Sequence, residues 1–123
     1  MWLLFSPQDV MDIHDGVLNP GELPGLAGSK SLEGLLGRVD TRLQYGQIND
    51  IYDLAAAYAM AVSQGHVFND GNKRTAYAVM DLCLSNHGVV MTWQIEEVGQ
   101  MIIDVAQGKV DETELAAWLR VYR

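Results

Sequence analysis

The sequence HVFNDGNKR, residues 66–74, decides how the rest of the chain is interpreted. It contains one histidine, one aspartate, one glycine and two cations within nine residues. The segments on either side carry apolar residues at helical spacing, which places the stretch where one helix ends and the next begins. The first amides of a helix carry unpaired N–H groups and partial positive charge, so such a junction predicts an anion-binding site.

Two cations, Lys73 and Arg74, fall in the first turn of the helix that Gly71 opens. Cations are unfavourable at this position because the helix dipole already makes that end positive. A bound anion would reverse the penalty, and Gly71 has no side chain to block its approach. The pattern therefore favours a phosphate-binding turn.

The other polar residues of the stretch suit the transfer of a phosphate group. Asp70 is a candidate ligand for magnesium, which prefers one or two carboxylates together with phosphate oxygens. His66 is a candidate base, because histidine can accept a hydroxyl proton near neutral pH. A base, a metal ligand and donors for phosphate oxygens are the parts that phosphoryl or nucleotidyl transfer requires. We expect Phe68 to face inward and fix the loop.

Each of these residues also has a purely structural interpretation. Asp70 could only cap its helix, His66 could be bonded to backbone, and the two cations could be solvated surface charges. The functional hypothesis rests on all of them falling at one junction. A Walker phosphate loop does not fit, since Gly65 and Gly71 enclose five residues rather than four and no strand precedes them.

The rest of the chain predicts an all-α bundle of about six helices. Candidate helix starts at Ser6, at Asn49 or Asp50, and at Asp111 precede apolar stripes at helical spacing, and glycines such as Gly65 close them. Between the first two stripes, the segment from 16 to 29 is dense in glycine and proline. That density predicts a long loop, and long loops in compact domains are often functional.

Length and composition restrict the class of protein. The 123 residues fit a single domain, 1–123, and the formal net charge of −8 argues against direct binding to nucleic acid. The apolar start, residues 1–5, is too short for a signal peptide or a membrane span, and we expect a buried strand or docking segment there. One cysteine, Cys83, fits a cytoplasmic protein; with His87 alone it makes no zinc site, so we expect a buried thiol.

Residues 66–74 match the pattern His-x-Phe-x-Asp-x-Asn-Lys-Arg without a gap, and in this the chain resembles the Fic/Doc family, specifically its death-on-curing (Doc) toxins. His14, the loop residues 21–25 and the Gly-Arg-Val of 37–39 extend the resemblance over nearly the whole chain. It implies the all-α Fic fold, with residues 16–30 as a flap over the substrate.

The resemblance also implies a reaction. Typical Fic enzymes transfer AMP from ATP to a protein hydroxyl and carry Gly-Asn-Gly-Arg in the motif, whereas Lys73 stands at the second glycine here. Doc toxins are protein kinases, and their implied target is a threonine of elongation factor Tu, whose phosphorylation halts protein synthesis. By position, His66 would activate the target hydroxyl and Asp70 would bind Mg²⁺. The phosphates of ATP would be held by Gly71, Asn72, Lys73 and Arg74, the last two also stabilising the transferring group.

A partner is implied as well. Such toxins pair with an antitoxin whose disordered C-terminal tail folds onto the toxin as a helix in a groove. The apolar candidates to line that groove are Trp2, Leu3, Leu4, Trp93 and Trp118, although most are expected in the core. Residues 29–34 match the Ser-x-x-x-Glu-Gly pattern of some inhibitory Fic helices, and we interpret this match as an ordinary helix start.

Three alternatives stay open from the sequence. The chain could be an adenylyl transferase, or a catalytically idle module that engages an antitoxin and its operator complex. It could also act on another small phosphorylated metabolite, because the pocket residues alone do not name the substrate.

Overall fold

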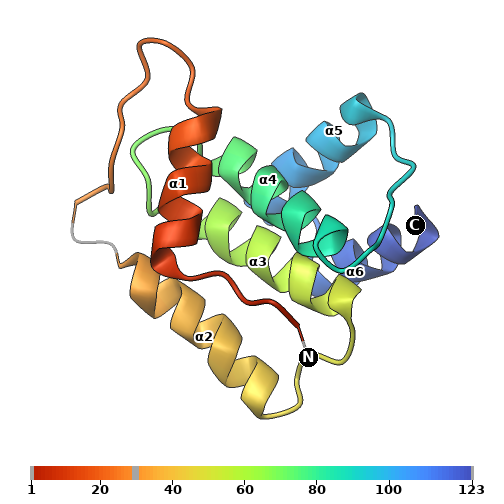
Figure 1. Cartoon of the computed structure of the whole chain (residues 1–123). Helices are drawn as coiled ribbons and strands as arrows, with labels where there is room; N and C mark the ends of the chain where they lie inside the picture. Colours follow the sequence, from red (N-terminus) through yellow and green to blue (C-terminus); the bar gives the residue numbers. More distant parts are fainter. Residues whose placement is uncertain (1, 29–30, 123) are drawn as a thin grey trace.

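The computed structural model describes residues 2–28 and 31–122, and in that part of the chain it has six helices and no strand (Figure 1). The helices are α1 (Pro7–Val17), α2 (Leu32–Gln44), α3 (Ile51–Gly65), α4 (Asn72–Ser85), α5 (Ile95–Ala106) and α6 (Glu112–Val121). The prediction of an all-α bundle is confirmed. None of these six helices is long and apolar enough to cross a membrane.

Local capping explains where most of the helices begin. The Ser6 hydroxyl accepts a hydrogen bond from the Asp9 amide at 3.1 Å, and the Asp9 carboxylate accepts one from the Ser6 amide at 2.8 Å, which forms a capping box at α1. Asp50 caps α3 and Asp111 caps α6, as the sequence predicts, and Ser31 caps α2. Side chains thus satisfy amides at four of the six helix starts.

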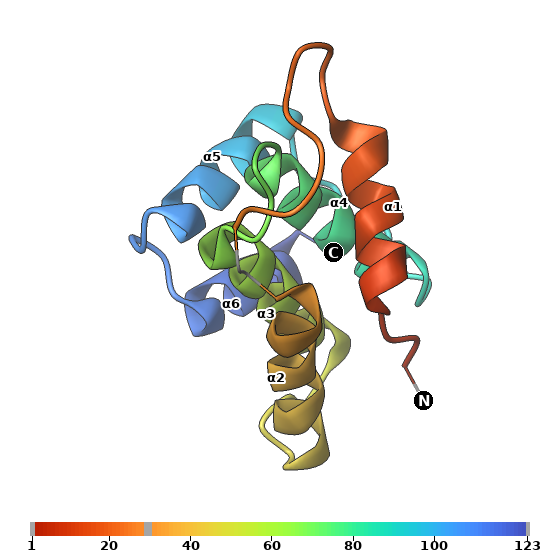
Figure 2. The ribbon, with the colours of Figure 1, turned by 90° about the vertical axis from the view of Figure 1, so that its left-hand side faces the viewer.

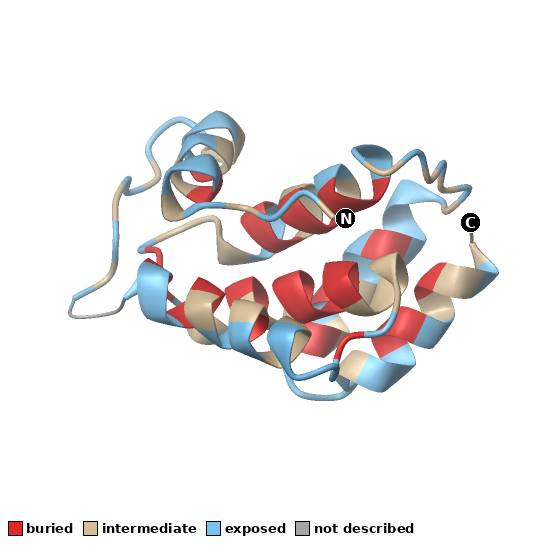
Figure 3. Ribbon diagram, turned by 60° about the horizontal axis from the view of Figure 1, so that its bottom comes forward, coloured by how far each residue is buried: buried red, intermediate tan, exposed pale blue. Residues whose placement is uncertain are grey.

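Helix α3 lies at the centre of the bundle. It contacts α2, α4, α5 and α6, whereas α1 packs on α4 and on α2 (Figures 1 and 2). Residues 54–59 of α3 are all buried, and four of the six are alanine, which lets neighbouring helices approach closely. Buried residues follow the sides on which the helices face one another (Figure 3).

The loop after α1 starts later than the sequence predicts. Gly16 was expected to begin it, but α1 continues to Val17 and the described part of the loop covers residues 18–28. Glycine costs only about 1 kcal/mol in a helix relative to alanine, and a last turn tolerates that cost. Residues 29 and 30, which belong to the predicted flap and to the 29–34 match, lie outside the described residues.

Gly65 ends α3 as predicted, but for a different physical reason. A glycine at this position was expected to supply the left-handed conformation, and His66 takes it instead, with φ of 48°. Gly65 itself stays helical, and a Cβ there would overlap Leu35 Cδ1 of α2. A larger residue at position 65 would therefore force the buried Leu35 side chain of α2 to move.

The N-terminal segment docks on the bundle without forming a strand. The Phe5 amide donates to the Tyr58 hydroxyl at 3.2 Å, and the Leu3 amide donates to His87 Nε2 at 2.8 Å. His87 Nδ1 in turn lies 2.7 Å from the Cys83 carbonyl oxygen. His87 therefore links this segment to α4. The thiol of Cys83 is buried, as expected, and burial raises its pKa to about 12.

Candidate functional site

The start of α4 has no side-chain cap. Its N-cap is Gly71, with φ of 80°, and no side chain accepts a hydrogen bond from its first amides. The hypothesis that Asp70 only caps this helix does not hold, because its carboxylate is turned elsewhere. Asp70 Oδ2 accepts a hydrogen bond from the amide of Leu23, in the loop after α1, at 2.8 Å. The amides of the first turn, which carries Lys73 and Arg74, are thus left for an anion.

Asp70 is held from a second side by a buried histidine. His14, on α1, is fully buried, and its Nε2 lies 2.7 Å from the carbonyl oxygen of Asp70. The imidazole also stacks on the Phe68 ring, with 3.8 Å between the ring centroids and 6° between the planes. The expectation of an inward Phe68 is confirmed, and His14 and Phe68 together fix the connection between α3 and α4.

The side chain of Asn72 fixes the same connection from the other end. Its Oδ1 accepts from the Phe68 amide at 3.1 Å, and its Nδ2 donates to the Phe68 carbonyl oxygen at 3.0 Å. Because the Asn72 side chain is bonded to Phe68, its predicted role in binding phosphate is left to its backbone amide, in the first turn of α4. This role stays a prediction.

The loop after α1 lies along the motif, at the position predicted for a flap (Figures 1 and 2). The Ala27 amide donates to the Val67 carbonyl oxygen at 2.7 Å, and the Asn69 amide donates to the Gly25 carbonyl oxygen at 3.2 Å. These bonds accompany an isolated antiparallel bridge between Leu26 and Phe68. We call residues 18–28 the flap from here on.

Glu22 of the flap forms an ion pair with Arg74, which the sequence did not reveal. Arg74 Nε also donates to the Val17 carbonyl oxygen at 3.1 Å, and the Glu22 carboxylate accepts from the Asn19 amide at 2.6 Å. The pKa of Glu22 is lowered, first by its hydrogen bond with Arg74 and then by the Asn19 amide. An acid of the flap thus pairs with a cation that the sequence predicts to bind phosphate.

His66 stands at the other end of the connection, exposed to solvent. It is the one residue other than glycine with a positive φ in the described part of the chain. Such a conformation is uncommon outside glycine and gathers at functional sites. No hydrogen bond fixes its ring to another described residue, so the interpretation of His66 as a backbone-bonded loop histidine gains no support.

A cavity of about 460 Å³ adjoins the two cations of the motif. Its lining comprises Val17, Lys73, Arg74, Tyr77, Ala78, Ile95, Val98, Gly99, Ile102 and Ile103. His66 and Asp70 are not among these residues. The structure therefore places Lys73 and Arg74 beside an apolar cavity, and His66 and Asp70 on the connection that leads into α4.

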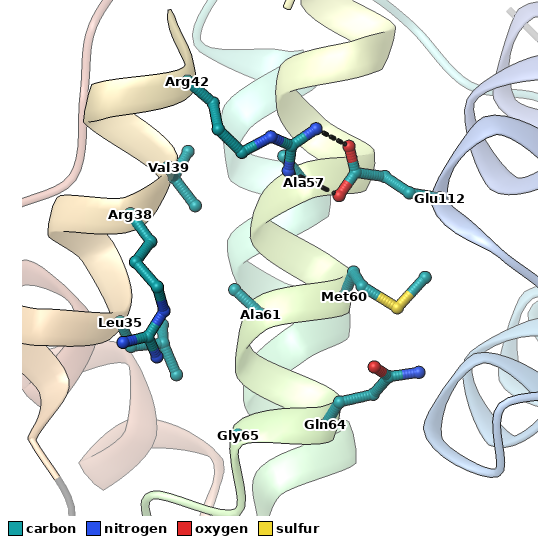
Figure 4. A pocket seen from close by; sticks show the side chains of 10 residues that line it. All are labelled: Leu35, Arg38, Val39, Arg42, Ala57, Met60, Ala61, Gln64, Gly65 and Glu112. Carbon is teal, nitrogen blue, oxygen red and sulfur yellow. Dashed lines mark hydrogen bonds and ion pairs between the residues drawn. The ribbon is translucent and has the colours of Figure 1, made fainter. Parts of the chain in front are cut away.

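A second cavity, of about 320 Å³, lies between α2, α3 and the start of α6 (Figure 4). Arg42 crosses its upper part and makes a bidentate pair with Glu112, with 2.9 Å between Nη1 and Oε1. That pair raises the pKa of Arg42. Gly65, next to His66 in the sequence, lies at the far end. No other residue of the connection or of the motif lines this cavity.

A magnesium ion would have one carboxylate to bind at this site. Among the described residues no three His, Cys, Asp or Glu side chains lie close enough together to hold a metal. Asp70 alone still fits magnesium, because this ion is commonly held by one carboxylate and by phosphate oxygens of a bound nucleotide. The residues present thus suit a metal that arrives with its nucleotide.

Comparison with known proteins places the chain in a family. The family model described as Fic/DOC family matches residues 4–84, a span that includes α1, the flap and the motif, and the chain belongs to this family. It is also similar to the protein named Protein kinase doc from Escherichia phage P1. The two are 34% identical over 116 residues, which cover 94% of this chain and 91% of that protein.

Proposed function

We propose that the protein is the toxin of a toxin–antitoxin module and acts as a protein kinase that uses ATP. The observation that carries the proposal is the start of α4, whose N-cap Gly71 follows Asp70, whose first turn bears Lys73 and Arg74, and whose first amides have no side-chain cap. The likeness to a protein named a kinase supports the choice of reaction. The proposed target is a threonine of a translation factor, elongation factor Tu, whose modification would halt protein synthesis.

The reaction follows from the roles of these residues. The amides of the first turn of α4, with Lys73 and Arg74, hold the phosphates of ATP. His66 accepts the proton of the threonine hydroxyl, whose oxygen then attacks the terminal phosphorus, and ADP leaves with the electrons of the broken P–O bond. The two cations stabilise the charge that develops on the transferring group. Magnesium bound at Asp70 would neutralise charge on the phosphates.

Two contacts of the flap must break before the phosphates can bind at the start of α4. In the structure Glu22 pairs with Arg74, and the Leu23 amide donates to Asp70. A phosphate oxygen would replace the Glu22 carboxylate on Arg74, and magnesium would compete with the Leu23 amide for Asp70. Nucleotide binding is therefore coupled to release of these two flap contacts.

The proposed partner is an antitoxin whose disordered C-terminal tail folds into a groove on the toxin. Among the predicted groove residues, Leu3 and Leu4 are 63% and 43% exposed. Trp93 and Trp118 are half-buried and stack on each other, with 5.9 Å between ring centroids. The N-terminal segment is the better candidate surface of the two, because Leu3 and Leu4 are exposed whereas Trp93 and Trp118 are half-buried.

A labelling experiment tests the reaction. Purified protein, elongation factor Tu and Mg²⁺ are incubated with ATP labelled at either the terminal or the α phosphorus. We expect the terminal label to appear on the factor, and His66→Ala to abolish its transfer while the exposed control Lys109→Ala does not. Transfer of the α label would make the protein an adenylyl transferase. Growth arrest by His66→Ala at equal expression would favour an idle binding module.

A further inference from the structure

His14 is a fully buried histidine that the proposed reaction does not use. Its Nε2 lies 2.7 Å from the carbonyl oxygen of Asp70. A carbonyl oxygen can only accept, so Nε2 carries the proton and donates. Nδ1 is then an acceptor, and it is buried with no hydrogen-bond partner among the described residues. The carboxylate of Asp15 is 3.7 Å from it, which is too far for a hydrogen bond.

The unpaired Nδ1 separates two reasons for having a histidine at this position. The ring stacks on Phe68, but a phenylalanine at position 14 would stack as well and would bury no polar atom. A buried acceptor without a partner is unfavourable. Packing alone therefore does not account for the histidine. The feature that it adds is a donor directed at the Asp70 carbonyl oxygen.

That carbonyl belongs to the peptide unit that leads into α4. The unit is trans, and in a trans unit the C=O and the N–H point in opposite directions. Because the oxygen of Asp70 is held against a buried ring, the N–H of Gly71 points away from that ring. Gly71 is only half-buried, and no described residue accepts a hydrogen bond from its amide.

The next peptide unit is held in a similar way. The Gly71 carbonyl oxygen accepts from the amide of Thr75 at 2.9 Å and from its hydroxyl at 2.8 Å, and Thr75 is fully buried. Two successive carbonyl groups are thus fixed, by His14 and by Thr75. The two amides of the same units, those of Gly71 and Asn72, are fixed with them. Successive amides held in a turn can form a concave site for an anion.

We propose that His14 is a positioning residue of the phosphate site, whose bond to Asp70 sets the direction of the Gly71 amide. The inference rests on the proposed function and deepens it. His14 does not touch the phosphates and acts through the peptide unit between Asp70 and Gly71. The Gly71 amide is the donor that the ligand meets.

Four substitutions separate the hydrogen bond from the packing of the ring. His14→Phe keeps a ring that stacks on Phe68 and removes the donor. His14→Gln carries an amide nitrogen about as far from the main chain as Nε2, whereas the shorter His14→Asn does not reach the carbonyl oxygen. Val10→Ala is the matched control, because Val10 is fully buried one turn earlier on α1.

Calorimetric titration of the full chain with ATP and with inorganic tripolyphosphate, each with Mg²⁺, measures the effect. We expect His14→Phe and His14→Asn to weaken both ligands by the same factor, about tenfold, through loss of one charge-assisted hydrogen bond. His14→Gln should stay within about twofold of the native affinity, since it restores one donor. Val10→Ala should bind both ligands like the native protein.

Transfer of the terminal label gives a readout that a merely structural role would not change. In His14→Phe the KM for ATP should rise about tenfold and kcat should change little, because the Gly71 amide binds phosphate both before and during transfer. Simple destabilisation would reduce the amount of folded protein. It would then lower the apparent kcat and leave KM unchanged.

The outcomes separate this inference from the proposed function. Label transfer with unchanged affinity for both ligands in His14→Phe would overturn the positioning role and keep the kinase. Equal affinities in His14→Gln and His14→Asn would overturn it too, and this comparison holds even where His14→Phe does not fold. A Gly71 amide resonance that tripolyphosphate leaves unmoved in the native protein would also overturn it. Failure of the native protein to bind either ligand would overturn both proposals.

Discussion

The contact between Glu22 and Arg74 makes the flap a competitor of the nucleotide, and Glu22→Gln tests this. Glutamine keeps the length of the side chain and still accepts the hydrogen bond of the Asn19 amide. It removes the negative charge that Glu22 places beside Arg74. The phosphates of ATP then meet an arginine that is no longer neutralised. We expect the substitution to strengthen ATP binding.

The size of the effect follows from exposure of the pair. The side chain of Glu22 is 25% exposed and that of Arg74 is 42% exposed. Ion pairs open to water are modest, so their loss corresponds to a change in affinity of about two- to fivefold. The gain should shrink as salt increases, because screening weakens the pair.

Titration calorimetry with ATP and Mg²⁺ measures the effect, with Glu33→Gln as a control that changes the net charge equally in the first turn of α2.

The pH dependence gives a second check. The hydrogen bond from Arg74 lowers the pKa of Glu22, so its carboxylate stays ionised to more acidic pH than an ordinary glutamate does. The difference between native protein and Glu22→Gln should therefore be present at neutral pH and be lost only as the pH falls through the lowered pKa of Glu22. An unchanged or weaker affinity for ATP in Glu22→Gln would refute the competition.

Three further predictions concern stability and reactivity. Gly65→Ala should lower the free energy of unfolding by about 1–3 kcal/mol through overlap with α2, whereas Gly37→Ala should not lower it; denaturant titration checks both. His14→Ala should cost about 3 kcal/mol in the same titration, because it empties a buried site and leaves the Asp70 carbonyl oxygen without its donor. Cys83, with a pKa of about 12, should resist alkylation at pH 8 in the folded protein and react once the chain is unfolded.

Features set by neighbouring residues could be predicted from the sequence. The caps at Ser6, Asp50 and Asp111 depend on hydrogen bonds across three residues, so the local pattern is enough to find them. The junction between α3 and α4 was found in the same way, because apolar periodicity stops at Gly65 and resumes after Gly71.

Features that depend on distant segments could not be predicted. Glu22 meets Arg74 across 52 positions, and nothing in the flap sequence distinguishes this acid from a solvated one. A Cβ at Gly65 would overlap Leu35, on another helix. The sequence did not show this, because a glycine at the end of a helix already has an ordinary local explanation. The cavity beside Tyr77 likewise forms only when α5 packs on α4, so its apolar residues read simply as core.

The central claim is that the first turn of α4 binds the phosphates of a nucleotide, and nuclear magnetic resonance tests it most directly. ATP with Mg²⁺ is titrated into labelled protein while the backbone amides are followed. The account predicts the largest shifts at Gly71, Asn72, Lys73 and Arg74, with smaller ones in the flap. Binding of ATP that leaves these four amides unmoved, with shifts elsewhere, would contradict it.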